Sequence, residues 1–295
     1  MSKRHKALAA IIACVLFWGF SFISIKITVA VFPPMSLGML RFAIALVFLY
    51  FIKLRLAPDE KLKAADLPLL FAAGLTGVTL YFFCENNGVA LVSASEASIA
   101  IGAIPVLSLA ADWLTGKSRI QARQWLGSLI SIAGVWLVAG VSLAISGSVL
   151  GYIFMAGAAL SWVAYSLLTR SLSGHSRIFI VFWQSVAGFI GFIPFSLIEL
   201  RSWGRPDLGV IIHLLFLAIC CSALGYLFYV QALEGLGISG CAIFINLIPV
   251  VTVICGFFVL GDRLSPLQWL GAALVISGVY LAMWEKREKI NEKSN

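Results

Sequence analysis

The 295-residue sequence has few charged side chains. Asp, Glu, Lys and Arg make up 12% of its residues, whereas 61% are hydrophobic. A typical soluble domain has about 25% charged residues. So few polar side chains cannot cover the surface of a soluble globule of this length. The composition therefore excludes an ordinary soluble protein.

Charge is missing altogether from several long stretches. A helix needs roughly 20 apolar residues to cross a bilayer. Uncharged runs close to that length or longer occupy residues 7–25, 67–84, 124–169, 178–198, 208–233, 235–261 and 264–284. We predict an all-α polytopic membrane protein with ten transmembrane helices, at residues 7–29, 36–54, 67–89, 95–115, 122–143, 149–170, 178–199, 208–231, 238–260 and 266–284.

Motifs for catalysis, metals and cofactors are also missing. The three histidines lie in a tail, a loop and a span end, and the six cysteines fall within predicted spans without metal-ligand spacing. The sequence has no zinc motif, nucleophile elbow or phosphate-binding loop. We therefore expect no enzyme activity, no metal and no cofactor.

The positive charge is distributed unevenly across the predicted membrane. The net charge of +8 would also fit a nucleic-acid-binding protein, but its placement favours a membrane topology. With the N-terminus in the cytoplasm, sixteen Lys and Arg residues lie on that side, and three, Arg201, Arg205 and Arg263, lie outside. Cytoplasmic loops are enriched in Lys and Arg. We predict cytoplasmic termini and no binding to nucleic acid.

Several sequence motifs of the first half recur in the second half, 144 residues later. Ile104-Pro105-Val106 returns as Ile248-Pro249-Val250, and Gln124-Trp125-Leu126-Gly127 returns as Gln268-Trp269-Leu270-Gly271. Such a period predicts two repeats, at 1–145 and 146–285, followed by a tail at 286–295. Five spans per repeat is an odd number, so the second repeat would enter the membrane from the opposite side. Inverted repeats of this kind are typical of alternating-access transporters.

Several motifs resemble a known family. LFWGFSFISIK at 16–26, Pro33-Pro34 and Leu40-Arg41-Phe42 resemble the first repeat of the drug/metabolite transporter superfamily, and most of all its ten-helix EamA-type metabolite exporters. Pro105 and Pro249 resemble the prolines of the family's fourth and ninth helices. The resemblance covers nearly the whole chain. It implies an exporter of small metabolites, such as amino acids, in the inner membrane of a bacterial cell.

Charges inside the predicted spans are candidates for binding this metabolite. A charge at the centre of a membrane helix costs about 2.5–3.5 kcal/mol on insertion scales, so each one calls for a reason. Lys26, Arg41, Glu85 and Glu96 fall at similar depth in the first four spans. Two cations and two anions there would suit the carboxylate and ammonium of a zwitterion. The alternative is that they snorkel or form structural salt bridges. For Asp112 we expect a structural pairing, with Lys117 or Arg119.

Uncharged polar and aromatic residues complete the predicted path. Asn86, Gln231 and Asn246 would orient a polar ligand, or instead join helices by hydrogen bonds. Seven aromatic residues are candidates for the cavity wall and would otherwise be ordinary packing residues, namely Trp18, Tyr81, Phe83, Trp162, Tyr165, Tyr226 and Tyr229.

Prolines and glycines in the spans suggest mobile and close-packed positions. Pro105 and Pro249, at the centres of their spans, would kink or break the helix and act as hinges. Gly127, Gly134, Gly271 and Gly278 would let helices approach closely, within the chain or in a homodimer.

The function predicted from the sequence is secondary active export of a small polar or zwitterionic, amino-acid-like metabolite across the lipid bilayer. A channel-like or structural membrane protein with passive flux is the alternative. The sequence leaves open whether a proton or another ion is coupled to transport and whether the chain dimerises.

Overall fold

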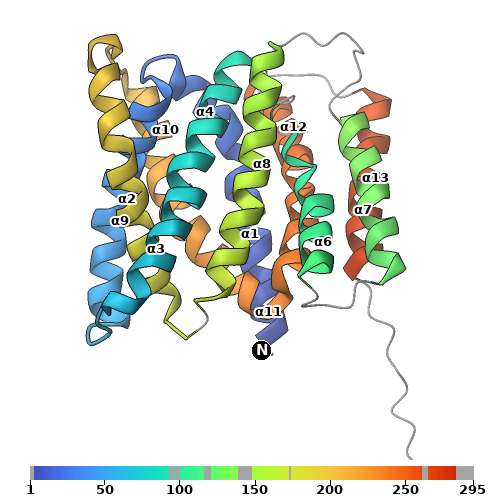
Figure 1. Cartoon of the computed structure of the whole chain (residues 1–295). Coiled ribbons are helices and arrows are strands. Elements are labelled where there is room, and N and C mark those ends of the chain that lie inside the picture. The colour runs from blue at the N-terminus through green and yellow to red at the C-terminus, as the bar shows by residue number, and fades with distance from the viewer. Residues whose placement is uncertain are drawn as a thin grey trace, which may run out of the picture.

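The computed structural model describes residues 3–92, 97, 100–115, 121–138, 148–172, 174–260 and 265–283. Within these ranges the regular structure is entirely helical, and the helices stand side by side as one bundle (Figure 1). Seven of the described helices are long and apolar enough to cross a membrane, namely Lys3–Val29, Pro34–Leu56, Ala64–Leu91, Val149–Arg170, Arg177–Ser202, Leu208–Ile245 and Pro266–Met283.

The N-terminal part of the chain contributes the first group of helices. They are α1 (Lys3–Val29), α2 (Pro34–Leu56), the short 3₁₀ helix η1 (Ala64–Asp66), α3 (Leu67–Gly74), the π-helical segment η2 (Leu75–Leu80), α4 (Tyr81–Leu91), α6 (Ile104–Leu114) and α7 (Ala122–Val138). Pro34 begins α2, a position where a missing N–H costs nothing.

The C-terminal part follows a similar order. It contains α8 (Val149–Arg170), α9 (Arg177–Glu199), the 3₁₀ helix η3 (Leu200–Ser202), α10 (Leu208–Phe216), the π-helical segment η4 (Leu217–Leu224), α11 (Gly225–Ile245), α12 (Leu247–Leu260) and α13 (Pro266–Met283). In Figure 1, α1 begins and α13 ends on the lower face, which we call the terminal face. By contrast, α8 begins at the upper face.

The repeated glutamines cap two equivalent helices. The Gln124 side chain accepts a hydrogen bond from the Gln121 backbone N–H at 2.9 Å, just before α7. Gln268 does the same for Ser265 at 2.8 Å, before α13. A glutamine that reaches back over the first turn satisfies a donor that has no partner within the helix. The repeated Gln-Trp-Leu-Gly motif is therefore, in part, a helix-start signal.

The glycines of the repeat bring α7 and α13 into close contact. A Cβ on Gly127 would lie 2.5 Å from the Gly278 carbonyl oxygen, and a Cβ on Gly134 would lie 2.6 Å from the Val275 nitrogen. Both distances are too short for any side chain larger than hydrogen. These glycines therefore serve packing within the chain, the first of the two roles expected of them.

Two wide helical turns precede aromatic residues at the centre of the bundle. Segment η2 leads into Tyr81, and η4 ends just before Gly225-Tyr226. Short π-helical segments are rare and are frequent at functional sites. The Gly77 carbonyl accepts from the Tyr226 hydroxyl at 2.7 Å, and the Thr76 carbonyl accepts from Ser161 at 2.6 Å. The wide turns thus join α11 and α8 to the segment between α3 and α4.

The predicted hinge prolines follow breaks in their helices. Gly102 and Ala103 form a turn before α6, and Asn246 interrupts the path from α11 to α12. Pro105 and Pro249 then lie in the first turns of α6 and α12, where proline is tolerated. A further change of direction occurs at Gly237, whose φ of 72° is the left-handed conformation that favours glycine.

Candidate functional site

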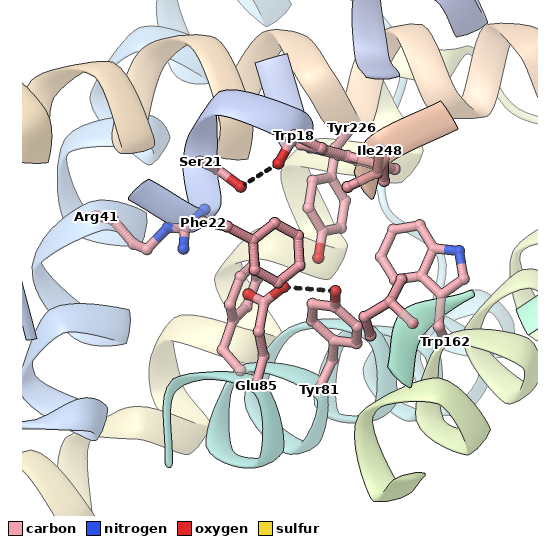
Figure 2. A pocket seen from close by; sticks show the side chains of 11 residues that line it. Trp18, Ser21, Phe22, Arg41, Tyr81, Glu85, Trp162, Tyr226 and Ile248 are labelled. Carbon is pink, nitrogen blue, oxygen red and sulfur yellow. Dashed lines mark hydrogen bonds between the residues drawn. The ribbon is translucent and has the colours of Figure 1, made fainter. Parts of the chain in front are cut away.

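A small cavity lies at the centre of the bundle, where α1, α2, α4, α8, α11 and α12 meet (Figure 2). Its volume is about 30 Å³. Eleven residues line it, namely Trp18, Ser21, Phe22, Arg41, Tyr81, Phe82, Glu85, Ile101, Trp162, Tyr226 and Ile248. Ligand pockets for small molecules measure roughly 300–1,000 Å³. The cavity is therefore nearly closed in this conformation.

Aromatic rings form one wall of the cavity. Trp18 and Trp162, which are 144 residues apart, meet edge to face with their ring centroids 5.0 Å apart. Tyr226 contacts both rings, at 6.1 Å and 5.8 Å. The Trp18 indole nitrogen donates to the Cys221 carbonyl at 3.2 Å, which fixes the ring against η4. Paired rings of this kind give a rigid apolar surface with defined edges and faces.

Arg41 enters the cavity from α2 and is only 2% exposed. Its Nε donates to the Ser222 hydroxyl at 2.9 Å, and its guanidinium lies 4.2 Å from the centroid of the Phe82 ring. Its buried Nη1 has no hydrogen-bond partner. A buried cation with an unused donor is costly unless an anion or water satisfies it. The position is therefore suited to a carboxylate.

Glu85 enters the same cavity from α4 and is 4% exposed. One carboxylate oxygen accepts a hydrogen bond from the Tyr81 hydroxyl at 2.7 Å. Both charged groups line the cavity, yet no ion pair within 4.0 Å joins Glu85 to Arg41. Figure 2 shows the two side chains approaching from different sides of the cavity that Phe22 also lines. Opposite charges that share a cavity without pairing can each hold one end of a zwitterion.

Of the other charged candidates, the structure describes one. Lys26, at the end of α1, is exposed and donates to the carbonyls of Val89 at 2.8 Å and Val92 at 2.9 Å. It thereby satisfies free carbonyls at the end of α4, where a cation is also favoured by the helix dipole. Lys26 does not line the cavity. Glu96 lies outside the described residues.

Two of the predicted amides tie helices together. The buried Asn86 donates to the Pro34 carbonyl at 2.8 Å, and the buried Asn246 donates to the Ser131 hydroxyl at 2.9 Å. The carbonyl oxygens of both side chains have no hydrogen-bond partner. Gln231 lies towards the terminal face, where it donates to the Lys6 carbonyl at 3.4 Å. None of the three lines the cavity.

Tyr165 and Tyr229, two of the aromatic candidates that do not line the cavity, form a second layer behind it. Tyr165 contacts Trp162 at 5.0 Å between centroids, and its hydroxyl donates to Gln184 at 3.2 Å. Tyr229 contacts Trp162 at 4.8 Å and shares a 2.7 Å hydrogen bond with Ser166. These residues hold the lining rings in place.

Asp112 makes contacts in a second region, nearer the terminal face. Its Oδ1 accepts from Arg170 at 3.3 Å, which forms an ion pair between α6 and α8. Its Oδ2 accepts from both the backbone N–H and the hydroxyl of Ser239 in α11. The expected partners Lys117 and Arg119 lie outside the described residues. Within the described structure, Asp112 pairs with Arg170.

Sequence reasoning missed Ser222, the hydrogen-bond partner of Arg41. Its equivalent in the other repeat is Val78, so the duplication gives no sign of a polar role. Phe82, Phe22 and Ser21 were also missed, because single aromatic or hydroxyl residues in an apolar run resemble ordinary packing residues. For Phe82 a signal was available, because it lies three residues before Glu85 and so shares a helix face with it.

The profile of the EamA-like transporter family matches the chain twice, at residues 5–140 and 149–284. A protein of Archaeoglobus fulgidus named "uncharacterized transporter" is 32% identical, over 91% of this chain and 95% of its own. Escherichia coli has a relative named "probable amino-acid metabolite efflux pump", 27% identical over 98% and 99% of the two chains.

Two further comparisons agree with these. A Streptantibioticus cattleyicolor relative named "probable terminal-alkyne amino-acid exporter" is 24% identical, over 95% of this chain and 94% of its own. A solved crystal structure has a similar fold, with a TM-score of 0.78 at 18% identity over 95% and 97% of the two chains. The protein is accordingly a multi-pass membrane transporter for a small molecule and not an enzyme. The chain belongs to the EamA-like transporter family.

Proposed function

We propose that this protein is a secondary active transporter that exports a small zwitterionic, amino-acid-like metabolite by alternating access. The observation that carries the proposal is the unpaired placement of Arg41 and Glu85 around one central cavity. The guanidinium matches a carboxylate in shape and charge. The Glu85 carboxylate would accept hydrogen bonds from an ammonium group. The names of two relatives, an amino-acid metabolite efflux pump and an amino-acid exporter, support this substrate class.

The aromatic wall would hold the rest of the substrate. Trp18 and Trp162 present ring surfaces beside the two charges. An ammonium group over a ring face gains a cation–π attraction, and an apolar side chain gains buried area. Tyr165 and Tyr229 support these rings from behind. The cavity must enlarge to admit even a small amino acid, so the conformation described here would be an occluded one.

The architecture proposed for alternating access is ten spans in two inverted halves, 1–145 and 146–285, with 286–295 as a cytoplasmic tail. The family profile matches twice with an offset of 144 residues, which supports two repeats. Helices that are equivalent in the proposed repeats pack in pairs, α2 on α9 and α7 on α13. The opposite directions of α1 and α8 in Figure 1 support inversion. The breaks before Pro105 and Pro249 would serve as hinges near the midplane.

We propose, on the strength of the positive-inside bias, that the terminal face lies in the cytoplasm and that the protein is located in the inner membrane of a bacterial cell. The ion pair of Asp112 with Arg170 would then close the inner route to the cavity. For export, this pair has to open so that substrate can enter from the cytoplasm.

Counterflow in proteoliposomes tests the proposed function. Vesicles containing the purified protein are loaded with an excess of one unlabelled amino acid at a time, and uptake of the labelled compound is followed. A carrier gives saturable, transient accumulation above equilibrium for at least one amino acid. The channel-like alternative predicts linear flux without accumulation, and that result across a full amino-acid panel would overturn the proposal. An imposed pH gradient in the same vesicles tests coupling to protons.

A further inference from the structure

A second pocket, separate from the central cavity, opens near the terminal face. It has a volume of about 250 Å³ and lies among α1, α6, α7, α8, α11 and α13. The residues that carry its chemistry are Arg4, Asp112, Arg123, Arg170 and Ser239. The central cavity and this pocket share no lining residue. The function proposed above uses Arg170 in its pair with Asp112 but assigns no role to Arg4 or Arg123.

Positive charge exceeds negative charge in this pocket. The described lining has three arginines and one carboxylate, that of Asp112. Both oxygens of this carboxylate are engaged, one by Arg170 and the other by Ser239. The carboxylate is thus taken up by Arg170 and Ser239, and no ion pair joins Arg123 to an acidic group among the described residues. The described lining of the pocket has no further acidic side chain.

Arg123 has a buried hydrogen-bond donor that is available to a ligand in this pocket. It lies in the first turn of α7, and its Nε is buried without a hydrogen-bond partner. Buried donors in proteins nearly always find an acceptor, in protein, water or ligand. The α7 N-terminus adds the positive end of a helix dipole at the same place. The geometry of a guanidinium suits carboxylate and phosphate oxygens.

From these contacts we propose that the pocket binds a small oxyanion, a carboxylate or a phosphate group, between Arg123 and Arg170. Its volume suits a single anionic group and not a large ligand. The same chemistry has two sources, a soluble anion and the headgroup of an anionic phospholipid. An oxyanion here would compete with Asp112 for Arg170 and so weaken the contact that joins α6 to α8.

Binding is tested on the purified full-length protein in an uncharged detergent. Inorganic phosphate and acetate are titrated at constant ionic strength, with chloride as the reference, and the thermal unfolding midpoint is followed. A ligand that binds the folded state raises the midpoint in a saturable way. The variants are Arg123→Gln, Arg123→Lys and, as a matched control on another surface, Arg201→Gln. Size-exclusion chromatography confirms that each variant is folded and monodisperse.

We expect saturable stabilisation of the wild type by phosphate, acetate or both. Arg123→Gln should raise the apparent Kd about tenfold or more. Arg123→Lys should raise it about threefold, because lysine keeps the charge but lacks the paired N–H donors of the guanidinium. Arg201→Gln should leave the Kd unchanged. Two results would count against binding of a soluble anion: a shift of the wild-type unfolding midpoint no larger than that with chloride, or an Arg123→Gln variant that binds like the wild type. Either result overturns the proposal if phospholipid also has no effect.

A lipid arm separates the two sources. Phosphatidylglycerol is added to the micelles in place of phosphatidylcholine, with the same variants. The ligand is a lipid headgroup if phosphatidylglycerol competes with phosphate, or if it stabilises the wild type but not Arg123→Gln. The ligand is soluble if only the soluble anions bind. No effect in either arm rejects the site. None of these measurements depends on transport, so failed amino-acid counterflow would reject the proposed function and leave this site standing.

Discussion

Two pairs of opposite charges between the described helices are arranged differently. Asp112 and Arg170 meet at 3.3 Å, and Ser239 completes the coordination of the carboxylate. Arg41 and Glu85 line one cavity without forming an ion pair, and an Arg41 nitrogen is left without a partner. The first pair is satisfied by protein alone, and the second is not.

Under the proposed function, the first pair would close a route to the cavity and the second would bind a ligand. Leaving a charge buried and unpaired is strongly unfavourable, so evolution retains such a group where something outside the chain compensates it. A satisfied pair between helices can instead hold one conformation. The residues of the central cavity should therefore determine substrate binding, and those near the terminal face should determine access.

The strongest test of this contrast removes the cation of the central pair. Arg41→Gln should reduce the counterflow efficiency of the best amino-acid substrate by roughly 30- to 1,000-fold, the effect of deleting one member of a desolvated charge pair. Arg41→Lys should lower the counterflow efficiency less, because lysine keeps the positive charge but lacks the paired N–H donors of the guanidinium. Initial rates in proteoliposomes over a range of substrate concentrations measure both effects.

Ser222→Ala serves as the control for Arg41. It removes the hydrogen bond that orients Nε and leaves the cation in place, so we expect a loss of about tenfold or less. If Arg41→Gln is folded by size exclusion and transports at the wild-type rate, the cavity does not use this guanidinium and the proposed substrate orientation is wrong.

Replacing Glu85, the anion of the same pair, tests whether it binds the ammonium end of the substrate. Glu85→Gln keeps the size of the side chain and should lower amino-acid counterflow about 10- to 100-fold, the range for hydrogen bonds to charged groups. Competition by the deaminated analogue of the substrate should be nearly unchanged. A parallel loss of affinity for both compounds would mean that Glu85 acts through the protein structure and not through the ammonium group.

Much of the fold could be predicted from the sequence, because the bilayer restricts it. Long uncharged runs have to be helical, and most described helices lie within or near the ranges expected. The exception is α11, which runs through the loop expected at 232–237 and is kinked there at Gly237. The Trp18 and Trp162 offset also pointed to two rings that meet in the structure at 5.0 Å. A duplicated residue keeps its role if the repeat keeps its geometry, so its position is informative without a structure.

The pairing of intramembrane charges could not be predicted in the same way. Lys26, Arg41 and Glu85 look alike as single charges in apolar runs. The structure separates them: Lys26 reaches the free carbonyls at the end of α4, 63–66 residues away in sequence, whereas the other two share a cavity. Which groups are satisfied depends on contacts between helices that hydropathy does not specify. Ser222 was missed for the same reason.

Breaking the satisfied pair should change access more than binding. Asp112→Asn keeps the shape and the hydrogen-bonding capacity toward Ser239 but removes the attraction to Arg170, which is 36% exposed. We expect a shift of the conformational equilibrium toward opening at the terminal face, by about three- to tenfold. The measurement is alkylation of Cys241, buried two residues beyond Ser239, in a protein that retains it as its only cysteine.

Asp59→Asn is the matched control, because Asp59 is exposed in the loop after α2 on the same face. It should leave the alkylation rate of Cys241 unchanged. Equal rates in Asp112→Asn and the parent would show that the Asp112–Arg170 contact does not govern access.

The smallest effect is expected at a carboxylate outside the membrane. Glu60, in the loop after α2, accepts from the Ser176 N–H at 3.1 Å and contacts His175 at 3.0 Å, which joins this loop to the start of α9. Partial burial raises the pKa of Glu60, but the hydrogen bonds from Ser176 and the interaction with His175 outweigh it, and the pKa falls below its ordinary value of 4.5. The folded state therefore favours the ionised form.

The sign of the pH dependence follows from this shift. The stabilisation by Glu60 should be complete well above pH 4.5 and should be lost as the pH falls through the lowered pKa. The thermal midpoint of the wild type should exceed that of Glu60→Gln near pH 6, by an amount equivalent to about 1 kcal/mol or less, and the difference should shrink below pH 4.5. Asp59→Asn, measured at the same pH values, is the matched control. A difference that grows as the pH is lowered would mean that the protonated form of Glu60 makes the better contact with Ser176, and the loop would then be held by a neutral hydrogen bond, unlike the charged pair of Asp112 and Arg170.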